Sequence, residues 1–196
     1  LAAPETIATH ILIPGLKPFL ARYPMLELEI VTGVAPVGIA RGEADLALRL
    51  VAPERGSLTR RKVGEMAYGL YADTSRPIDL GTARLVGWAR EIDLPADRWL
   101  RRLTGRGPDF RTNQLETQRA AIAAGMGVGV LPCFLVQGLA RISEASKLEE
   151  TLWLVTHKEA EGGRIRRVYD EIASIVLAAR DRLLGRGHQL DSTQRN

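Results

Sequence analysis

Residues 112–132, Thr-Asn-Gln-Leu-Glu-Thr-Gln-Arg-Ala-Ala-Ile-Ala-Ala-Gly-Met-Gly-Val-Gly-Val-Leu-Pro, decide the fold class of this chain. Leu115, Ile122 and the alanines around Ile122 recur at helical spacing, and Gly125 follows where a helix end favours a left-handed residue. Residues 128–131 form a short apolar run that Pro132 ends, which predicts a buried strand. A helix, a glycine turn and a strand in this order are typical of α/β proteins.

The glycines at 125, 127 and 129 permit a second interpretation, a loop that cradles a phosphate group. Phosphate loops run from a strand through glycines into a helix, so that the positive helix N-terminus faces the anion. Here the glycines leave a helix and enter a strand, which presents the negative helix end instead. The order of the elements therefore argues against nucleotide binding by this segment.

Size and composition indicate a globular protein. The chain has 196 residues, of which 45% are hydrophobic, enough for one domain or two small lobes sharing a linker. No run of about 18 apolar residues occurs, so no membrane partner is expected. Cys133 is the single cysteine, which leaves no internal disulfide and no cysteine metal site, and its apolar neighbours predict a buried thiol. We expect a cytoplasmic protein.

The formal net charge is +4, but the basic residues do not form one continuous patch. Their densest groups, at 60–62, 98–111 and 164–167, are separate, and each is interleaved with acidic or apolar residues. The chain carries no helix-turn-helix pattern, zinc finger or aromatic platform for nucleic acid. Direct DNA binding by this chain is therefore not expected.

Three passages resemble, in order and spacing, the effector-binding domain of LysR-type transcriptional regulators. Residues 123–132 are similar to the family signature AAGxGIxxLP. Residues 1–4 with 12–14 and 19–24 resemble the opening strand and helix of the family, and residues 26–33 followed by 39–49 resemble its G-E-L-D-L-A-I region. The resemblance spans roughly residues 1–182.

Strands alternate with helices along the chain, which predicts parallel sheets with crossover connections. Strands are expected at 1–4, 26–31, 45–50, 65–72, 83–89, 110–112, 128–131 and 152–156, and helices at 7–22 (kinked or restarted at Pro14), 37–41, 97–103, 115–124 and 165–182, with a polar loop at 55–61. The resemblance implies a two-lobed fold of the type II periplasmic-binding-protein class, in which each lobe is a small, mainly parallel sheet flanked by helices and two crossover strands form a hinge.

The expected organisation places residues 1–68 with 152–184 in lobe I and residues 69–151 in lobe II, followed by a flexible tail at 185–196. The chain does not start with methionine and begins inside a predicted strand. We therefore expect a piece of a longer protein. The resemblance implies that the part absent from this chain includes an N-terminal DNA-binding domain, a winged helix-turn-helix.

Ligands of open α/β sheets bind beyond the carboxyl ends of the strands. The residues at those ends are Pro4, Glu5, Thr6, Thr32, Gly33, Val34 and Arg49 in the first lobe, and Trp88, Thr112 and Asn113 in the second. Their hydroxyl, amide and guanidinium groups suit a small organic acid. The carboxylate of Glu5 would repel an anion, so an amine, an amino acid or a neutral ligand stays open. The resemblance implies effector contacts chiefly at Thr6, 32–34, Arg49 and Asn113.

The same residues have structural interpretations as well. Thr6 and Asn113 are expected to cap the helices that follow them, whether or not they contact a ligand. Arg49 has possible ion-pair partners in Glu5 and Asp45, and Trp88 is a candidate core residue.

Catalysis finds little support in the sequence. The three histidines show no metal-ligand spacing with carboxylates, and no serine or cysteine belongs to a nucleophile motif. We predict no catalytic residue, no metal and no cofactor, and hence no enzyme. The resemblance implies a bacterial sensing domain that binds a small-molecule effector between its lobes and forms homodimers, reaching DNA only through the absent domain. Exposed Ile and Leu side chains on 7–22 and 118–124 are candidates for the dimer contact. A free-standing solute-binding protein and an enzyme of the same fold class are the alternatives.

Overall fold

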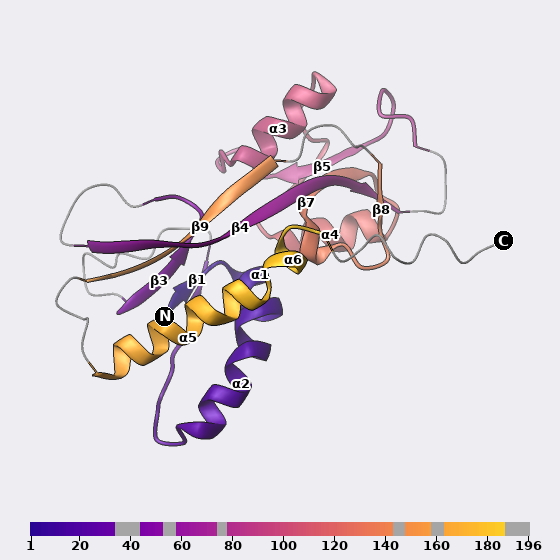
Figure 1. Ribbon diagram of the computed structural model, residues 1–196. Helices are drawn as coiled ribbons and strands as arrows, with labels where there is room; N and C mark the ends of the chain where they lie inside the picture. Colours follow the sequence, from indigo (N-terminus) through magenta and orange to yellow (C-terminus); the bar gives the residue numbers. More distant parts are fainter. Residues whose placement is uncertain (34–43, 53–57, 74–77, 143–147, 158–162, 187–196) are drawn as a thin grey trace. The chain divides into compact units, whose positions relative to one another are not determined.

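The computed structural model describes residues 1–33, 44–52, 58–73, 78–142, 148–157 and 163–186 (Figure 1). The elements are β1 (Ala2–Ala3), α1 (Glu5–Ile7), a π-helical turn (Ala8–Leu12), α2 (Ile13–Arg22), β2 (Val31–Thr32), β3 (Leu46–Arg49), β4 (Leu58–Ala72), β5 (Leu85–Trp88), α3 (Pro95–Thr104), β6 (Phe110–Thr112), α4 (Leu115–Ala123), β7 (Val128–Pro132), a 3-10 turn (Cys133–Leu135), β8 (Ala140–Arg141), β9 (Leu148–His157), α5 (Gly163–Ala178) and α6 (Arg180–Leu183). Within these ranges, no helix combines the length and apolar character needed to cross a bilayer.

The chain divides into two compact units. Unit 1 contains the described residues of 1–65 and 150–180, and unit 2 those of 66–149 and 181–186. Strands β4 and β9 each contribute residues to both units. The helix predicted at 37–41 lies outside the described residues.

Each unit is built on parallel strands. In unit 1, β1 pairs in parallel with β2 and β3, and β9 runs antiparallel to β3. In unit 2, β5 pairs in parallel with β6 and β7, whereas β4 runs antiparallel to β7 and β8 antiparallel to β4. The predicted α/β class, with parallel strands and helical crossovers, is therefore confirmed.

The two crossover strands, β4 and β9, are both longer than predicted. β4 begins at Leu58 rather than at 65, and β9 covers Leu148–His157 rather than 152–156. The two strands are neighbours in the hydrogen-bond order β2-β1-β3-β9-β4-β7-β5-β6. The polar loop predicted at 55–61 is wrong for 58–61, because extended pairing holds these polar residues in β4. The Arg60 guanidinium lies 5.7 Å from the ring centre of Trp153 on β9.

The first helical segment contains a wide turn instead of a simple kink. Residues 8–12 are π-helical and stand directly before the α2 segment that contains Pro14. Proline has no N–H to donate, and its ring clashes with the carbonyl four residues earlier, which here belongs to His10. A π-turn relieves such a clash without ending the helix.

The strand predicted at 26–31 is observed only at its end, as the two-residue strand β2. Half-buried and exposed side chains alternate from Leu26 to Ile30, but β2 covers only Val31–Thr32. β2 is the edge strand of unit 1, so a single neighbour, β1, is available for pairing. The backbone nitrogen of Leu1 donates to the Glu29 carbonyl (2.9 Å), which holds the approach to β2 beside β1.

The 112–132 stretch folds as a helix, a glycine turn and a strand, as predicted. The N–H groups of Gly125 and Met126 donate to the carbonyls of Ile122 and Ala121, which is the Schellman arrangement, and Gly125 has φ +72°. A Cβ on Gly127 would strike the backbone carbonyl of Arg84. A Cβ on Gly129 would lie 2.7 Å from the Val86 carbonyl oxygen and 2.8 Å from Ile122 Cδ1. Gly127 and Gly129 thus let β7 approach β5 and α4 closely.

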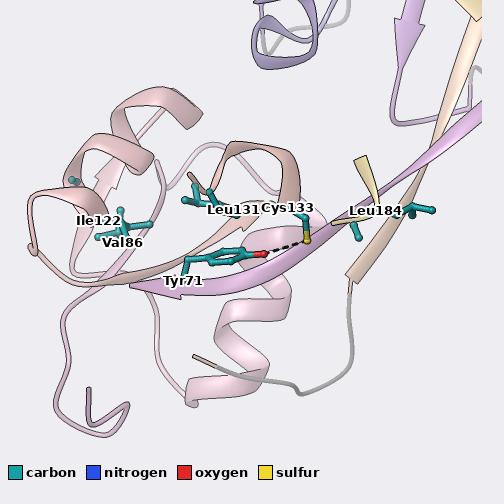
Figure 2. Packing of buried hydrophobic residues seen from close by; sticks show 9 residues of the cluster. Tyr71, Val86, Ile122, Leu131, Cys133 and Leu184 are labelled. Atoms are coloured by element: carbon teal, nitrogen blue, oxygen red, sulfur yellow. Dashed lines mark hydrogen bonds between the residues drawn. The ribbon is translucent and has the colours of Figure 1, made fainter. Parts of the chain in front are cut away.

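The core of unit 2 lies between β4, β7, β5 and α4. Figure 2 shows Val86, Ile122, Leu131 and Cys133 among its buried side chains, and Leu184 belongs to the same cluster. The predicted burial of Cys133 is confirmed at 3% exposed, and its Sγ accepts a hydrogen bond from the Tyr71 hydroxyl at 3.3 Å. Burial raises the pKa of Tyr71 above its ordinary value, and this hydrogen bond raises it further.

Candidate functional site

Unit 1 gathers its predicted site residues at the carboxyl ends of three neighbouring strands. Ala3 is in register with Thr32, so the residues that follow, Pro4 and Gly33, leave adjacent strands at the same level. Ala2 is in register with Ala47, which places Arg49 at the level of Pro4. The structure therefore brings these ends together at one edge of the sheet, as the rule for open sheets predicts. Val34 lies outside the described residues.

Glu5 and Thr6 begin the helix directly after that edge. Pro4 is the N-cap of α1, and no side chain caps this helix. The predicted capping role of Thr6 is therefore wrong: Thr6 lies inside the first turn and is 4% exposed. Glu5 is half-buried in the same turn, where its carboxylate interacts favourably with the positive end of the helix dipole.

Unit 2 gathers a second set at the carboxyl ends of β5 and β6. Trp88 and Thr112 end these two parallel strands and are in register with each other. The Ala89 N–H donates to the Thr112 carbonyl (3.0 Å), and Arg111 donates to the Trp88 carbonyl (3.2 Å). The backbone is thus held where both strands stop.

The predicted helix cap at Asn113 is wrong. The helix starts two residues later, at Leu115, with Gln114 as N-cap and without a side-chain cap. Thr112 supports the turn instead, because its Oγ1 accepts a hydrogen bond from the Gln114 N–H at 3.3 Å. Asn113 is exposed in this turn. The hydroxyl of Thr112, and not the amide of Asn113, is thus the side-chain acceptor in the turn before the helix.

Trp88 is buried, with 6% of its surface exposed, which agrees with the structural interpretation of this residue as part of the core. Its indole Nε1, however, has no hydrogen-bond partner among the described residues. The same holds for Nε2 of Gln118, which is 1% exposed in α4. Gln118 is the residue that sequence reasoning missed. The signal was present, since a glutamine stands between Leu115 and Ile122 on the apolar stripe of the helix.

Two carboxylates near β5, those of Asp97 and Asp109, have structural roles. Asp97 is 4% exposed and accepts from Arg101 Nε at 2.7 Å through one carboxylate oxygen, while its Oδ1 has no partner among the described residues. Asp109 accepts from the Leu85 N–H (2.8 Å) and from Arg106 (2.9 Å). The Leu85 hydrogen bond is the main reason why the pKa of Asp109 lies below its ordinary value. Within the described ranges, no group of three or more His, Cys, Asp or Glu side chains is arranged to hold a metal ion.

The fold and the strand ends define a class before any relative is considered. Two α/β units share two long strands, and polar side chains stand at the carboxyl ends of their parallel strands. This is the architecture of a ligand-binding domain of the periplasmic-binding-protein type. Residues 1–174 match the model of the LysR substrate binding domain, and the chain belongs to this family.

Similar proteins agree with this assignment. Over 132 residues the chain is 35% identical to the Mau operon transcriptional activator of Paracoccus denitrificans, a match that covers 67% of this chain and 46% of that protein. The chain therefore spans about half the length of this relative. The regulatory domain of CrgA, a LysR-type transcriptional regulator from Neisseria meningitidis, is 17% identical with a TM-score of 0.71, covering 90% of this chain and 95% of that domain.

The effector domain of the transcriptional regulator AmpR of Pseudomonas aeruginosa is 19% identical with a TM-score of 0.69, covering 91% of this chain and 96% of that domain. At these identities the two structures show the fold alone. They confirm the periplasmic-binding-protein-like fold, and the family match confirms a substrate-binding domain of a LysR-type regulator.

Proposed function

We propose that the domain senses a small-molecule effector, an organic acid or an amino-acid-like compound, at the carboxyl ends of its parallel strands. The observation that supports this proposal most directly is the register of the strand ends. Pro4, Gly33 and Arg49 meet at one edge in unit 1, and Trp88 and Thr112 meet at one edge in unit 2. Carboxyl ends of parallel strands are where open α/β sheets bind ligands.

The chemistry of these ends favours a ligand that carries both donors and acceptors. Arg49 supplies a cation that can hold a carboxylate, in a pair worth about 1.5–3 kcal/mol. Glu5 supplies an anion in unit 1 that would hold an ammonium group. A compound with a carboxylate and an ammonium group, such as an amino acid, satisfies both side chains, whereas a dicarboxylate satisfies only one.

We propose further that the complete protein is a bacterial transcription factor, with DNA bound by a separate N-terminal domain and with the sensing domains paired as homodimers. The support is membership of the LysR family. A regulator of transcription acts where the DNA is, so we propose a cytoplasmic location. The predicted dimer contacts need revision: Ile122 is buried on 118–124, and on 7–22 the exposed large hydrophobic side chain is Ile13, at 54%.

The effector would act by shifting an equilibrium between open and closed forms of the domain. A ligand moves such an equilibrium only by its difference in affinity for the two forms, and converting a 1:99 population into 99:1 takes about 5.5 kcal/mol. An enzyme and a free-standing solute-binding protein of the same fold class are the alternatives. Turnover of a bound compound would support the first, and a secretion signal in the gene upstream of Leu1 the second.

A thermal-shift screen of metabolites tests the proposed function. A compound at about 100 times its Kd stabilises the folded domain by roughly 2.7 kcal/mol, which a melting curve resolves. Arg49→Ala should weaken binding of the compound found. Arg98→Ala is the matched control, because Arg98 pairs with Asp93 on the exposed surface of α3 and should leave binding unchanged. Equal loss of binding in both variants would contradict a ligand role for Arg49.

A further inference from the structure

Trp88 and Gln118 place two unused hydrogen-bond donors inside unit 2. Trp88 Nε1 and Gln118 Nε2 are buried and have no partner among the described residues. Both atoms carry only N–H groups, so each requires an acceptor. Leaving such a group buried and unpaired costs about 1–3 kcal/mol, so each of the two donors calls for an acceptor.

The two side chains lie on the same face of the sheet. Side chains alternate along β5, so Trp88 shares a face with Val86, and Gly87 faces α3, where an added Cβ would lie 3.2 Å from Asp97 Oδ1. Val86 packs against Ile122 of α4, and Figure 2 shows these two side chains next to each other. The face that carries Trp88 is therefore the one that α4 covers.

The two side chains also lie at the same level. Gln118 precedes Ile122 by one helical turn on the inward stripe of α4, and Trp88 follows Val86 by two residues along β5. Both steps lead to the carboxyl edge of the sheet, because α4 starts at the end of β6 and β6 is parallel to β5. By this register, Trp88 and Gln118 both lie toward the end of the sheet at which α4 begins.

The surroundings of this pair add further donors. α4 starts without a side-chain cap, and the first N–H groups of a helix together form a positive end. The acidic residue of the first turn, Glu116, is separated from Gln118 by about 200° around the helix, so it projects away from the sheet. An oxygen-rich, negatively charged group fits a site built in this way.

We propose that Trp88 and Gln118 donate hydrogen bonds to a carboxylate of the effector, so that unit 2 holds an acidic group besides the one that Arg49 would hold in unit 1. Gln118 is a binding residue that the sequence motifs do not identify. This inference rests on the proposed function and specifies which chemical group unit 2 recognises. Thr112, in register with Trp88, lines the same edge and orients its hydroxyl through the bond from Gln114.

The indole N–H resonances of the chain provide a direct test. The protein has three tryptophans, so a ¹H–¹⁵N spectrum contains three indole signals, which Trp88→Phe assigns. The chain is titrated with acetate and benzoate, and in parallel with ethylamine, benzylamine and chloride. We expect the carboxylates to move the Trp88 signal downfield, while the signals of Trp99 and Trp153 stay in place. Movement by the amines, equal movement by chloride, or no movement by either carboxylate would refute the proposal.

Gln118→Met separates binding from structure. It removes the amide at nearly constant volume, and Gln114→Met, in the exposed N-cap position, is the matched control. We expect the Kd of the carboxylate that moved the Trp88 signal to rise by about tenfold or more, which corresponds to the loss of one hydrogen bond to a charged group. The melting temperature without ligand should stay the same or rise, because an unpaired buried group is removed.

A fall in melting temperature with unchanged carboxylate affinity would show that Gln118 is structural, with its amide paired to a buried water, and would overturn the proposal. The proposed function has a separate readout. A metabolite that stabilises the domain and depends on Arg49, but leaves the Trp88 resonance in place, would refute the role of Trp88 and Gln118 and leave effector sensing intact.

Discussion

Gly129→Ala is the substitution that best tests why the 112–132 stretch contains its glycines. In the structure an added Cβ would lie 2.7 Å from the Val86 carbonyl oxygen and 2.8 Å from Ile122 Cδ1. The isoleucine methyl can rotate away, but the carbonyl belongs to the backbone of the neighbouring strand. β7 must then move away from β5, which disturbs the pairing of Val86 with Gly129.

The expected cost is that of overpacking a buried core, about 1–3 kcal/mol. For a chain of this size, 2 kcal/mol corresponds to a fall of roughly 4–8 °C in the melting temperature. Thermal unfolding followed by circular dichroism measures this change. Gly81→Ala is the matched control, because the nearest atom to its Cβ is the exposed Asp79 carboxylate at 3.3 Å, and it should alter stability by less than about 0.5 kcal/mol.

The result that would refute this reasoning is a Gly129→Ala protein as stable as the wild type that has also lost affinity for inorganic phosphate or a nucleotide. That outcome would mean that the glycine serves an anion and not the approach of β7 to β5. The order of helix, turn and strand would then have been interpreted wrongly.

Three further substitutions test the packing and electrostatics of unit 2. Asp109→Asn should destabilise the protein at pH 7. Because the pKa of Asp109 is lowered in the folded state, the stability that its carboxylate contributes is complete above the unfolded pKa of about 3.9 and is lost as the pH falls through the folded pKa. The difference in unfolding free energy between wild type and variant, measured by urea titration, should therefore close below about pH 4. A difference that is independent of pH would contradict the assignment. Ile122→Ala removes a fully buried side chain and should cost about 2–5 kcal/mol in the same titrations, and a cost below 1 kcal/mol would show that α4 is loosely packed. Tyr71→Phe should cost no more than about 1.5 kcal/mol, because the Cys133 thiol is a weak acceptor, and a larger loss would reveal a second role for the hydroxyl.

Much of the candidate site was predictable because it depends on where strands end. The strand ends at Arg49, Trp88 and Thr112 lie within one residue of the ends predicted for the strands at 45–50, 83–89 and 110–112. Helix caps were less predictable. Thr6 and Asn113 have the composition of N-caps, but at both positions the helix starts at a different residue, as the proline before Glu5 and the hydroxyl of Thr112 illustrate. Several residues near a helix start can satisfy the same N–H groups, and the sequence does not rank them.

The sequence predicts the alternation of strands and helices, the glycine turn after α4 and the parallel pairing within each unit. It does so because hydrophobic periodicity and left-handed turns are local properties. The pairing of β4 with β9, the loss of a ladder between 26 and 30, and the burial of Gln118 were decided by the tertiary structure. Each of these depends on a partner far away in the chain. A polar strand forms where a long neighbour supplies its hydrogen bonds, an alternating segment stays unpaired where the sheet ends, and a glutamine becomes a buried donor where α4 is pressed against β5.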